Sequence, residues 1–330
     1  GNIMKTWLIT GGCGFIGLNL INKLLLQDDV RIIVLDDLSV CDEGRLPFVE
    51  KKVDLSCDSG PLGKIEEKII LIKCDIANQH ETRKIIVHAD VLVHLAANTG
   101  VGPSVEDPFF DMQSNVIGTV NMLELARVNN IPKFIFASSG APAGNVVPPI
   151  TENIVPKPIS PYGASKLAGE GYCSAYFNSF GVNTVALRFS NVYGPRSEHK
   201  NSVVAKFIKQ ALSNLPYEIF GDGSQTRDFI FISDLVEAIL LAEAANNVAG
   251  EILQIATNQE TSILDIAEEI RKYVYKVTGV HTNKLHSQKR IGDVERNFAD
   301  ISKAKDLLGW KPEISLSDGI HATVKEFYNV

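Results

Sequence analysis

The stretch that decides the fold lies near the start of the chain and has the sequence Thr10-Gly11-Gly12-Cys13-Gly14-Phe15-Ile16-Gly17. It joins an apolar run at residues 6–10, which predicts a strand, to residues 15–26, which predict a helix. We expect Gly11 to allow the tight turn, Gly14 to let a pyrophosphate approach the backbone, and Gly17 to let helix and strand pack closely. Backbone amides at the start of the helix, around Phe15 and Ile16, favour an anion. The G-x-x-G-x-x-G spacing in this context therefore predicts a dinucleotide-binding turn.

An acidic pair, Asp36-Asp37, follows the second predicted strand, residues 31–35. Asp36 lies about 20 residues beyond the glycine turn, where a carboxylate can accept hydrogen bonds from the adenine ribose. No Arg comes directly after the pair to accept a 2′-phosphate, so the sequence favours NAD over NADP. The alternative for Asp36 is an ordinary strand-end turn. Asp75 and Ile76 close the third predicted strand, residues 69–74, within reach of the adenine; Asp75 can instead cap a helix.

Tyr162 and Lys166 are four residues apart near the start of a predicted helix, residues 162–180, so both side chains share one face. At ~5 Å and an effective dielectric of ~20, the ammonium would stabilise a phenolate by about 3 kcal/mol, which lowers the phenol pKa by about 2. Tyr162 would then be usable as a base. The alternative is a chance pair on a solvated helix, and the rest of the chain decides between the two.

The chain has 330 residues, of which 45% are hydrophobic and 22% charged, as in ordinary globular proteins. Predicted strands at 6–10, 31–35, 69–74, 91–95, 133–137 and 183–188 alternate with helical stretches at 15–26, 79–87, 110–129 and 162–180. This alternation predicts an α/β fold with a doubly wound parallel (Rossmann) sheet. We expect an NAD-binding domain of residues 4–188 plus 227–255 and a smaller α+β substrate lobe of residues 189–226 plus 256–330. Residues 41–67 are interpreted as a surface excursion.

Bulk properties argue against several classes of protein. A net charge of −7 argues against nucleic-acid binding through bulk electrostatics. No apolar run is long enough to span a bilayer. The five cysteines are an odd number without a Cys-x-x-Cys motif, so neither a disulfide framework nor a zinc site is expected. We therefore expect a protein of the reducing cytoplasm with no metal, nucleic-acid or membrane partner.

Further motifs follow along the chain, in the order His94-Leu95-Ala96-Ala97, Ser138-Ser139, Tyr162-Gly163-Ala164-Ser165-Lys166, Arg188-Phe189-Ser190-Asn191-Val192-Tyr193-Gly194-Pro195-Arg196, Phe220-Gly221-Asp222-Gly223-Ser224-Gln225-Thr226-Arg227-Asp228-Phe229 and Arg290-Ile291-Gly292-Asp293-Val294. With these motifs the chain resembles, over essentially its whole length, the extended short-chain dehydrogenase/reductase family. Within that family it is most similar to the nucleotide-sugar epimerases of the UDP-glucose 4-epimerase type.

The resemblance implies a catalytic site of Ser139, Tyr162 and Lys166. Tyr162 is the implied base, Lys166 lowers its pKa and holds the nicotinamide ribose, and Ser139 hydrogen-bonds the reacting sugar oxygen. The other residues implied to bind NAD, beyond the glycine turn and the acidic positions, are Leu95, Ala96, Ala97, Thr99, Asn115 and Phe189. For Asn115 a helical packing role is the alternative.

On the substrate side, the resemblance implies that Asn191 and a cationic clamp of Arg227 and Arg290 hold the pyrophosphate of a UDP-sugar, a use that suits guanidinium groups. Asp293 would take the nucleotide ribose. The residues implied to wall the uracil are Ser202, Val203, Val204, Tyr217 and Phe220. Asn297 occupies the family's size gate, where an intermediate residue leaves N-acetylhexosamines and uronic acids open as substrates.

The implied reaction is NAD-dependent epimerisation at C4 of a nucleotide-activated hexose, of the UDP-glucose/UDP-galactose type, through a transient 4-keto sugar. Dehydratases of the family carry Asp-Glu after the active-site Ser or Thr, and decarboxylases carry a Glu nearby, whereas Gly140 and Ala141 stand here. These two activities and a catalytically silent NAD-binding scaffold remain the alternatives. Ala143 replaces the Tyr usual in the family, which changes the floor of the sugar pocket.

The resemblance also implies a homodimer formed through a four-helix bundle. Apolar residues lie on more than one side of the two predicted helices, residues 110–129 and 162–180, as would be needed to face both a sheet and a partner. They are Val116, Val120, Leu123, Leu125, Tyr172, Ala175 and Phe177.

Overall fold

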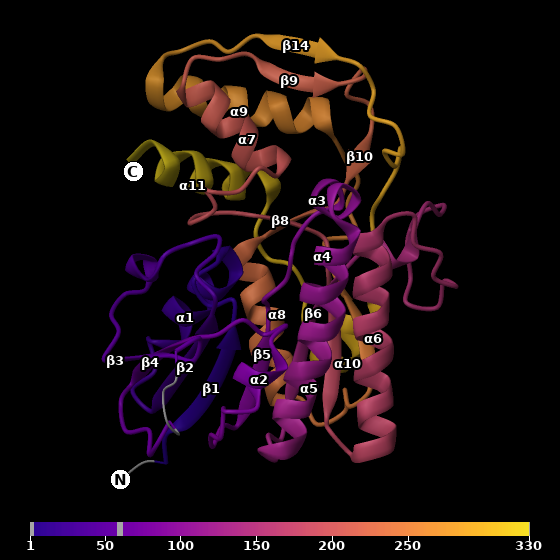
Figure 1. Cartoon of the computed structure of the whole chain (residues 1–330). Helices are drawn as coiled ribbons and strands as arrows, with labels where there is room; N and C mark the ends of the chain where they lie inside the picture. The colour runs from indigo at the N-terminus through magenta and orange to yellow at the C-terminus, as the bar shows by residue number, and fades with distance from the viewer. Residues whose placement is uncertain (1–2, 58–61, 330) are drawn as a thin grey trace. The chain divides into compact units, whose positions relative to one another are not determined.

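The computed structural model describes residues 3–57 and 62–329 (Figure 1). The chain divides into two compact units. The first unit comprises Gly1–Gly144, Val155–Arg188 and Ile239–Leu253. The second unit comprises Asn145–Ile154, Phe189–Ala238 and Gln254–Val330. Each unit therefore draws on segments that are far apart in the sequence.

The first unit is built on an eight-stranded sheet with the strand order β12-β7-β6-β5-β1-β2-β4-β3 (Figure 1). From β6 through β3 the neighbouring strands are paired in parallel. The bounds are β1 Lys5–Thr10, β2 Val30–Asp36, β3 Lys51–Asp54, β4 Ile69–Lys73, β5 Val91–His94, β6 Phe134–Ser139, β7 Thr184–Phe189 and β12 Glu251–Ile255. The predicted α/β fold is thus confirmed. The carboxyl ends of the parallel strands meet at one edge, where such sheets bind their ligands.

Helices connect the strands of this sheet. The bounds are α1 Phe15–Leu24, α2 Gln79–Thr82, α3 Val101–Glu106, α4 Pro108–Met112, α5 Gly118–Val128 and α6 Pro161–Phe180, while α8 Ile232–Ala244 runs through both units. Helices α2, α5 and α6 stand side by side (Figure 1). The strand order changes direction at β1, so right-handed crossovers place α1 on the opposite face of the sheet.

The edge of the sheet differs from the prediction. Residues 41–67, interpreted from the sequence as a surface excursion, contribute the 3₁₀ turn η1 Glu43–Arg45 and the strand β3. Strand β3 pairs in parallel with β4, from Lys51 opposite Ile70 to Asp54 opposite Lys73. Its pattern of burial is irregular, which explains why no strand was predicted. Residues 58–61 of the excursion lie outside the described residues.

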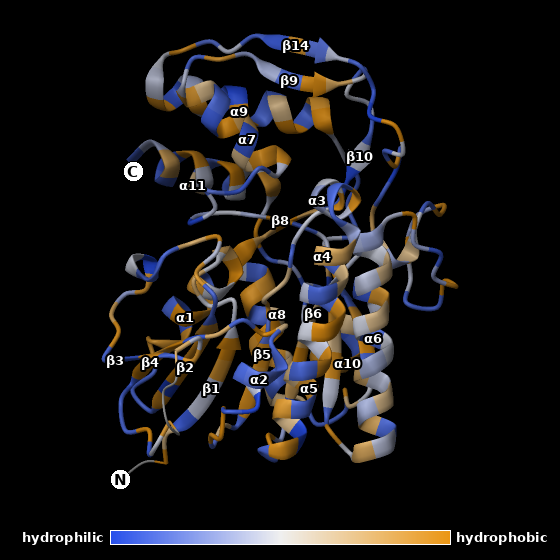
Figure 2. Ribbon diagram, in the orientation of Figure 1, coloured by the Kyte–Doolittle hydropathy of each residue, from blue (hydrophilic) through white to orange (hydrophobic). Residues whose placement is uncertain are grey.

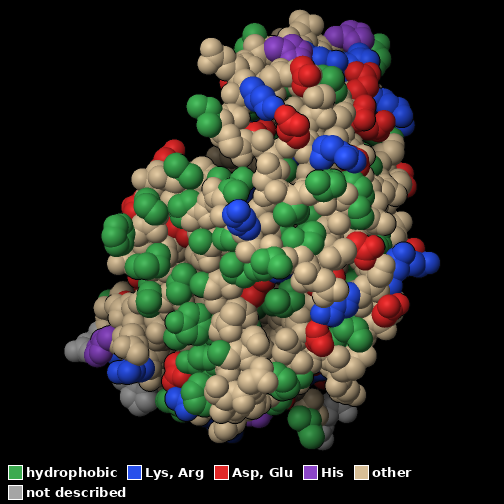
Figure 3. Space-filling model, turned by 90° about the vertical axis from the view of Figure 1, so that its right-hand side faces the viewer, with side chains coloured by type: hydrophobic (Ala, Val, Ile, Leu, Met, Phe, Trp, Pro, Cys, Tyr) green, Lys and Arg blue, Asp and Glu red, His purple; other side chains and the backbone are tan. Residues whose placement is uncertain are grey.

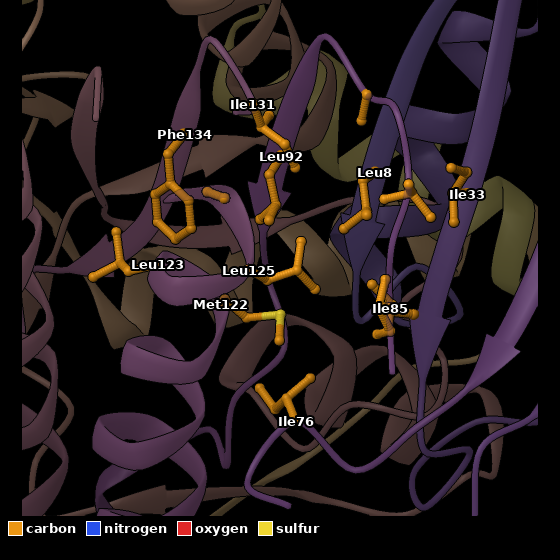
Figure 4. Packing of buried hydrophobic residues seen from close by; sticks show 14 of the residues in the cluster. Leu8, Ile33, Ile76, Ile85, Leu92, Met122, Leu123, Leu125, Ile131 and Phe134 are labelled. Atoms are coloured by element: carbon orange, nitrogen blue, oxygen red, sulfur yellow. The ribbon is translucent and has the colours of Figure 1, made fainter. Parts of the chain in front are cut away.

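The core of the first unit lies between the sheet and helix α5. Leu8, Ile33 and Leu92 come from the strands, and Met122 and Leu125 come from α5, all within one buried cluster (Figure 4). Figure 2 shows hydrophobic residues along the strands of this sheet and a mixture of polar and apolar residues on the helices that cover it. Leu123 and Leu125 are both buried, so they lie on the side of the helix that faces the sheet, and the predicted dimer is left to the other apolar residues of the two helices.

The helix predicted over residues 110–129 is divided into three segments. The first is α4, which Asp107 caps by accepting a hydrogen bond from the amide of Phe110 at 3.0 Å. The π-helical turn η2, Gln113–Ile117, comes next, and α5 follows it. Such π turns are frequent at functional sites because the extra residue re-aims a side chain. Here the turn contains Asn115, one of the predicted NAD-binding residues. The helix predicted over residues 79–87 is also shorter and ends at Thr82.

The second unit has its own core, formed around α7 Val203–Leu212, α9 Ile263–Thr278 and α11 Leu316–Asn329. Its short strands pair as β8 Asn191–Tyr193 with β11 Phe229–Phe231, β9 Tyr217–Phe220 with β14 Lys284–Ser287, and β10 Thr226–Arg227 with β13 Thr261–Ser262. The hydroxyl of Ser262 accepts a hydrogen bond from the amide of Asp265 at 3.0 Å and so caps the start of α9. Gly309, with φ of 63°, ends α10, Ser302–Leu308, as its sequence predicts. No helix among the described residues combines the length and the apolar character needed to cross a membrane.

Candidate active site

The glycine turn lies between β1 and α1 in the first unit. Gly11 has φ of 67°, and a Cβ atom built on it would lie 2.9 Å from the amide nitrogen of Ala96. A Cβ on Gly17 would lie 2.6 Å from the carbonyl oxygen of Gly11, so α1 could not pack on the turn with any larger residue. Gly12, to which the motif assigned no role, is also required, because a Cβ built on it would lie 2.6 Å from a methyl group of Val34.

The acidic residues near this turn are tied to backbone amides. Asp36 accepts hydrogen bonds from the amide of Cys13 in the glycine turn, at 3.0 Å, and from that of Leu38, at 2.9 Å. Burial raises the pKa of the Asp36 carboxyl, and the two amide donors oppose that effect. Asp37 instead bonds the amide and the hydroxyl of Ser39. Asp36 therefore joins the ends of β1 and β2, where the dinucleotide-binding turn was predicted.

Asp75 does not cap a helix. Its carboxylate accepts a hydrogen bond from the amide of Ala77 at 3.0 Å, and the N-cap of α2 is Asn78. Ile76, beside it, is buried against the core. The capping alternative for Asp75 is thus wrong, and its carboxylate stays near the end of β4.

The loop after β5 is held in place by hydrogen bonds that involve a buried histidine, His94. The hydroxyl of Thr10 accepts hydrogen bonds from the amides of Leu95 and Ala96, each at 3.0 Å, so its own proton is directed to Nδ1 of His94, 2.7 Å away. Nε2 of His94 then donates to the hydroxyl of Thr119 at 3.0 Å. Burial, together with the charge of Lys166, lowers the pKa of His94 to about 3, so the ring is neutral. His94 is therefore a structural link.

Asn115 holds the other part of this loop. Its side chain accepts a hydrogen bond from the amide of Asn98 at 2.8 Å and donates to the carbonyl oxygen of Asn98 at 3.0 Å. It also donates to the carboxylate of Asp111 at 3.1 Å and to the hydroxyl of Ser165 at 3.2 Å. The side-chain amide of Asn115 thus connects the loop that carries Thr99 to two helices, and in this way it holds the loop in position.

Tyr162 lies in the first turn of α6, where Ser160 caps the helix by accepting a hydrogen bond from the amide of Gly163 at 3.0 Å. Ser139 lies at the end of β6, and its hydroxyl is close enough to the Tyr162 phenol to lower the phenol pKa. The same hydroxyl accepts a hydrogen bond from the amide of Ala141 at 2.9 Å. A Cβ on Gly163 would lie 2.7 Å from the carbonyl oxygen of Ala141, so only glycine lets the turn η3, Ala141–Ala143, pack so closely on α6. The structure therefore brings Ser139 and Tyr162 together.

Lys166 lies one turn further along α6 and is 5% exposed. Its ammonium donates a hydrogen bond to the carbonyl oxygen of Ala137 at 2.8 Å. It lies 5.8 Å from the ring centre of Tyr162 and 5.1 Å from that of Phe136. The predicted pair thus shares one face of the helix and meets the end of β6.

The pKa values of the pair differ from the expectation. Burial raises the pKa of Tyr162 to about 12, and the hydrogen bond from Ser139 opposes this while the charge of Asp111 adds to it. The prediction that Lys166 brings the phenol below its usual pKa is therefore wrong for the protein alone. Burial lowers the pKa of Lys166 to about 8, against the charges of Asp111 and Glu170. At neutral pH the pair consists of a phenol and an ammonium.

Two buried acids near this pair were missed from the sequence. Glu170 forms a bidentate ion pair with Arg188, at 2.8 Å and 2.7 Å, and accepts a hydrogen bond from the hydroxyl of Ser138 at 2.6 Å. Asp111, 1% exposed, is the second. The spacing of Lys166 and Glu170 on one helix face was available in the sequence, but nothing in it showed that Arg188 or Asp111 would approach them.

In the second unit, two predicted substrate residues are paired with each other. Nη2 of Arg227 donates to the carboxylate of Asp293 at 2.5 Å. Its Nη1 donates to the carbonyl oxygens of Val294 and Thr226 at 2.7 Å and 2.6 Å. The predicted anion clamp and the predicted ribose acceptor therefore lie together, and the clamp already has protein acceptors.

Phe220 is enclosed by cations. The guanidinium of Arg290 lies 3.8 Å from its ring centre, and the ammonium of Lys206, which the sequence analysis did not select, lies 5.1 Å away. Lys206 is also paired with Glu218 at 2.9 Å. The remaining predictions in this unit divide by burial. Asn191 and Ser202 are exposed, and Phe189 is buried at the end of β7, while Val203 and Asn297 are half-buried.

Val204 and Tyr217 are side chains of the core in the second unit, with exposed fractions of 2% and 0%. The ring of Tyr217 packs 5.1 Å from that of Phe207. The expectation that these two side chains wall a base is therefore wrong, because other residues of the unit enclose them.

Asp228, also unpredicted, organises the same unit. Its buried carboxylate accepts hydrogen bonds from the amides of Thr257, Asn258 and Ala299 at 2.9, 3.0 and 3.2 Å. Its carbonyl oxygen accepts one from the amide of Asn191 at 3.0 Å. Asp228 thus fixes the position of the backbone that carries Arg227 relative to the backbone at Asn191. Among the described residues there is no group of acids, cysteines and histidines that could hold a metal ion.

Residues 7–256 match the model of the NAD dependent epimerase/dehydratase family. The chain belongs to this family. The resemblance drawn from its motifs is therefore confirmed, and NAD is the cofactor of the family. The match covers the glycine turn, the Ser139 and Tyr162 positions and the Arg227 segment.

Named relatives cover the chain almost end to end. It is 34% identical over 331 residues to a UDP-glucose 4-epimerase of Mycolicibacterium smegmatis, covering 99% of each chain. It is similar to the solved UDP-N-acetylglucosamine 4-epimerase of Methanobrevibacter ruminantium M1, with a TM-score of 0.87, 30% identity and 99% of each chain covered. It is also similar to the UDP-glucuronic acid 4-epimerase of Bacillus cereus, solved with UDP-glucuronic acid and NAD, with a TM-score of 0.81, 30% identity and coverage of 98% and 99%. These relatives share 4-epimerisation and differ in the sugar.

Proposed function

We propose that this chain epimerises a UDP-hexose at C4 by transient oxidation to a 4-keto sugar, with UDP-glucose or UDP-galactose as the favoured substrate. The observation that carries the proposal is that the Lys166 ammonium lies 5.8 Å from the Tyr162 ring centre and bonds Ala137 in β6, the strand that ends at Ser139. A hydroxyl placed between these groups can lose its proton while its carbon loses a hydride. The 4-epimerase relatives support this reading.

The residues of the first unit fit NAD. The glycine turn brings backbone amides to the start of α1 with little side-chain bulk, since a Cβ on Gly14 would meet only the carbonyl oxygen of Gly11, at 3.2 Å. Asp36 retains acceptor capacity for ribose hydroxyls beside its two amide donors. Lys166 has two further N–H groups beyond the one donated to Ala137, and these suit the nicotinamide ribose. When bound, NAD⁺ accepts the hydride from C4 and returns it.

The chain's own groups move the proton. Tyr162, as phenolate, takes the proton of the C4 hydroxyl and returns it to the same oxygen after the keto sugar has turned over and presents the opposite face of C4. Ser139 bridges the same oxygen and holds it at the phenol. Lys166, as an ammonium on the same helix face, favours the phenolate because opposite charges attract.

The residues of the second unit suit the UDP moiety. Arg227 and Arg290 carry the positive charge for a diphosphate, and exposed Asn191 offers an amide donor. The Phe220 ring, with Lys206 and Arg290 beside it, offers a face for a base. In this proposal the UDP moiety supplies remote binding energy, so that the sugar can be held loosely enough to turn over.

The neighbourhood of Ser139 disfavours dehydration and decarboxylation. Gly140 and Ala141 provide no acid, and a Cβ on Gly140 would meet no atom within 4 Å. An acid that eliminates water must lie beside the reacting sugar. The site therefore favours returning the hydride to C4.

The test is incubation of the purified protein with UDP-, dTDP-, GDP- and CDP-sugars, with the products identified by NMR. A C4 epimer of at least one UDP-hexose is expected. A 4-keto-6-deoxy sugar or a pentose product would replace the proposal with dehydration or decarboxylation. If no sugar gives a product but NAD is released on denaturation, the protein would be an NAD-binding scaffold without this activity.

We also propose a homodimer formed through α4, η2 and α6. Phe109, Phe110 and Ile117 are 74%, 53% and 42% exposed, and Tyr172 on α6 is 43% exposed. Hydrophobic side chains are exposed over much of the lower face in Figure 3. Light scattering should give twice the 36.1 kDa chain mass, and Phe110→Glu with Ile117→Glu should give the monomer. A monomeric wild-type protein would refute the dimer.

A further inference from the structure

Asp111 is a buried acid for which the proposed reaction has no use so far. It lies on the short helix α4 and is 1% exposed. Its carboxylate accepts a hydrogen bond from the side-chain amide of Asn115 at 3.1 Å, and the same amide donates to the hydroxyl of Ser165 at 3.2 Å. Ser165 precedes Lys166 in the chain and also hydrogen-bonds the carbonyl oxygen of Tyr162, at 3.0 Å. Asp111 is thus connected to the backbone that carries the catalytic pair.

Lys166 is a buried cation without a carboxylate in direct contact. Its ammonium is bonded to a neutral carbonyl oxygen, that of Ala137. A buried charge is strongly destabilising unless an opposite charge compensates it. The two acids that act on Lys166 electrostatically are Asp111 and Glu170.

Glu170 is already compensated. Both of its oxygens are bonded by Arg188, and one also accepts the hydroxyl of Ser138. This pair is buried on both sides, with side-chain exposures of 3% and 1%. Four buried ionisable groups therefore lie around this part of α6, two basic and two acidic; burial raises the pKa of Asp111, and the charge of Lys166 opposes that effect. Because Glu170 already neutralises Arg188, Asp111 is the buried acid that can neutralise Lys166.

We propose that Asp111 is the counter-ion of Lys166, a positioning residue whose buried negative charge keeps the catalytic ammonium in its charged form beside Tyr162. Asp111 acts through Lys166 and does not touch substrate or cofactor. It is held by Asn115, which also bonds Ser165 of α6, so its carboxylate is fixed relative to that helix. This inference adds to the proposed function and uses its assignment of Tyr162 and Lys166.

The groups that face Lys166 set the direction of the expected effects. They are Asp111 from α4, Tyr162, Glu170 and Cys173 from α6, and neutral His94 from β5. The negative charge of Asp111 raises the pKa of Lys166 and also that of Tyr162. Removing that charge should therefore lower both pKa values.

The test is Asp111→Asn, which keeps the size of the side chain and removes the charge. The Lys166 resonance is followed by NMR against pH in protein labelled with ¹³C at lysine Cε, and assigned by its absence in Lys166→Met. The titration midpoint should fall by about one pH unit, since an opposite charge nearby shifts a pKa by about 1–3. Both limbs of the pH–activity profile should move to lower pH.

Asp107→Asn is the matched control, because it removes a charge from the same helix at an exposed position and keeps a capping side chain. It should leave the Lys166 midpoint in place. An Asp111→Asn variant with lower activity at every pH but an unmoved Lys166 midpoint would reduce Asp111 to a packing role and overturn the proposal.

A measurement on the wild-type protein keeps the proposal testable if Asp111→Asn does not fold. The Asp111 carboxyl resonance, in protein labelled with ¹³C at aspartate Cγ, should respond to the same titration as Lys166. A carboxyl signal that does not change across that titration would contradict the ion pair. These readouts do not require turnover, so failure of the 4-epimerase assignment with a shifted Lys166 midpoint would leave the counter-ion intact.

Discussion

The catalytic residues of the first unit and the nucleotide-binding residues of the second unit are held in different ways. Tyr162 and Lys166 are fixed by contacts to β6, through Ser139 and Ala137. The charges around them are buried and balanced. Arg227, in contrast, is bonded to three acceptors of its own unit, and Arg290 is exposed over the ring of Phe220.

The catalytic groups are therefore pre-organised, whereas the nucleotide-binding groups must exchange protein partners for the ligand. The catalytic groups already have the contacts that the proposed reaction uses, so substrate needs only to enter. The guanidinium of Arg227 must share or give up the carboxylate of Asp293 before it can bond a diphosphate fully. We therefore expect substitutions in the first unit to change turnover or stability, and substitutions in the second unit to change affinity.

The largest effect is expected from Tyr162→Phe, which removes the proton acceptor and keeps the ring. Turnover should fall by about 10³-fold, within the range of general acid–base catalysis. The amount of NAD released on denaturation should stay at the wild-type level. Tyr328→Phe, at an exposed position in the second unit, is the control and should keep full activity. Turnover retained in Tyr162→Phe would end the assignment of Tyr162 as the base.

The second effect compares a buried and an exposed bidentate pair. Glu170→Gln leaves the Arg188 guanidinium buried without a carboxylate and should lower the free energy of unfolding by about 3 kcal/mol. Glu268→Gln breaks the same geometry with Arg271 on the surface and should cost about 0.5 kcal/mol or less. Urea unfolding of both variants measures the difference. Equal losses would show that the buried pair has no special role.

The fold and the NAD turn could be predicted because the signals are local. A strand, three glycines and a helix lie within a few residues of each other, and Asp36 follows at the next strand end. Tyr162 and Lys166 were equally visible as one helix turn. The strand β3 was missed, because its residues lack the alternation of a half-buried strand.

The environment of the site could not be predicted, because it is made by residues distant in sequence. Nothing near Tyr162 in the sequence shows that Asp111 approaches from another helix, or that burial raises the phenol pKa. Tyr217 was expected at a ligand surface from its place in the chain, yet Phe207 and the core of the second unit enclose it. Resemblance to a family predicts which positions in the chain have a role, whereas the exposure of each side chain depends on how the chain packs.

The third effect tests the second unit. Arg227→Lys keeps the charge but loses the planar fork, so it cannot bond a diphosphate in bidentate fashion. The dissociation constant for UDP, measured by calorimetry, should rise by about tenfold, with NAD content unchanged. Lys272→Arg, on the surface of α9 in the same unit, should leave it unchanged. Unaltered UDP affinity in Arg227→Lys would remove Arg227 from the clamp.

The smallest effect is a pH dependence that should distinguish the two units within the wild-type protein. Burial lowers the pKa of Lys166 to about 8, and the proposed reaction needs the ammonium. The ammonium is lost as the pH rises through that value, while the phenolate of Tyr162, whose pKa is about 12, increases with pH, so kcat/KM should rise up to about pH 8 and level off there. The guanidinium groups that bind UDP stay protonated throughout this range, so UDP affinity should not change between pH 7 and 9. A change in UDP affinity parallel to that in kcat/KM would place the pH dependence in the nucleotide clamp, whereas a break near pH 8 in kcat/KM alone places it at Lys166.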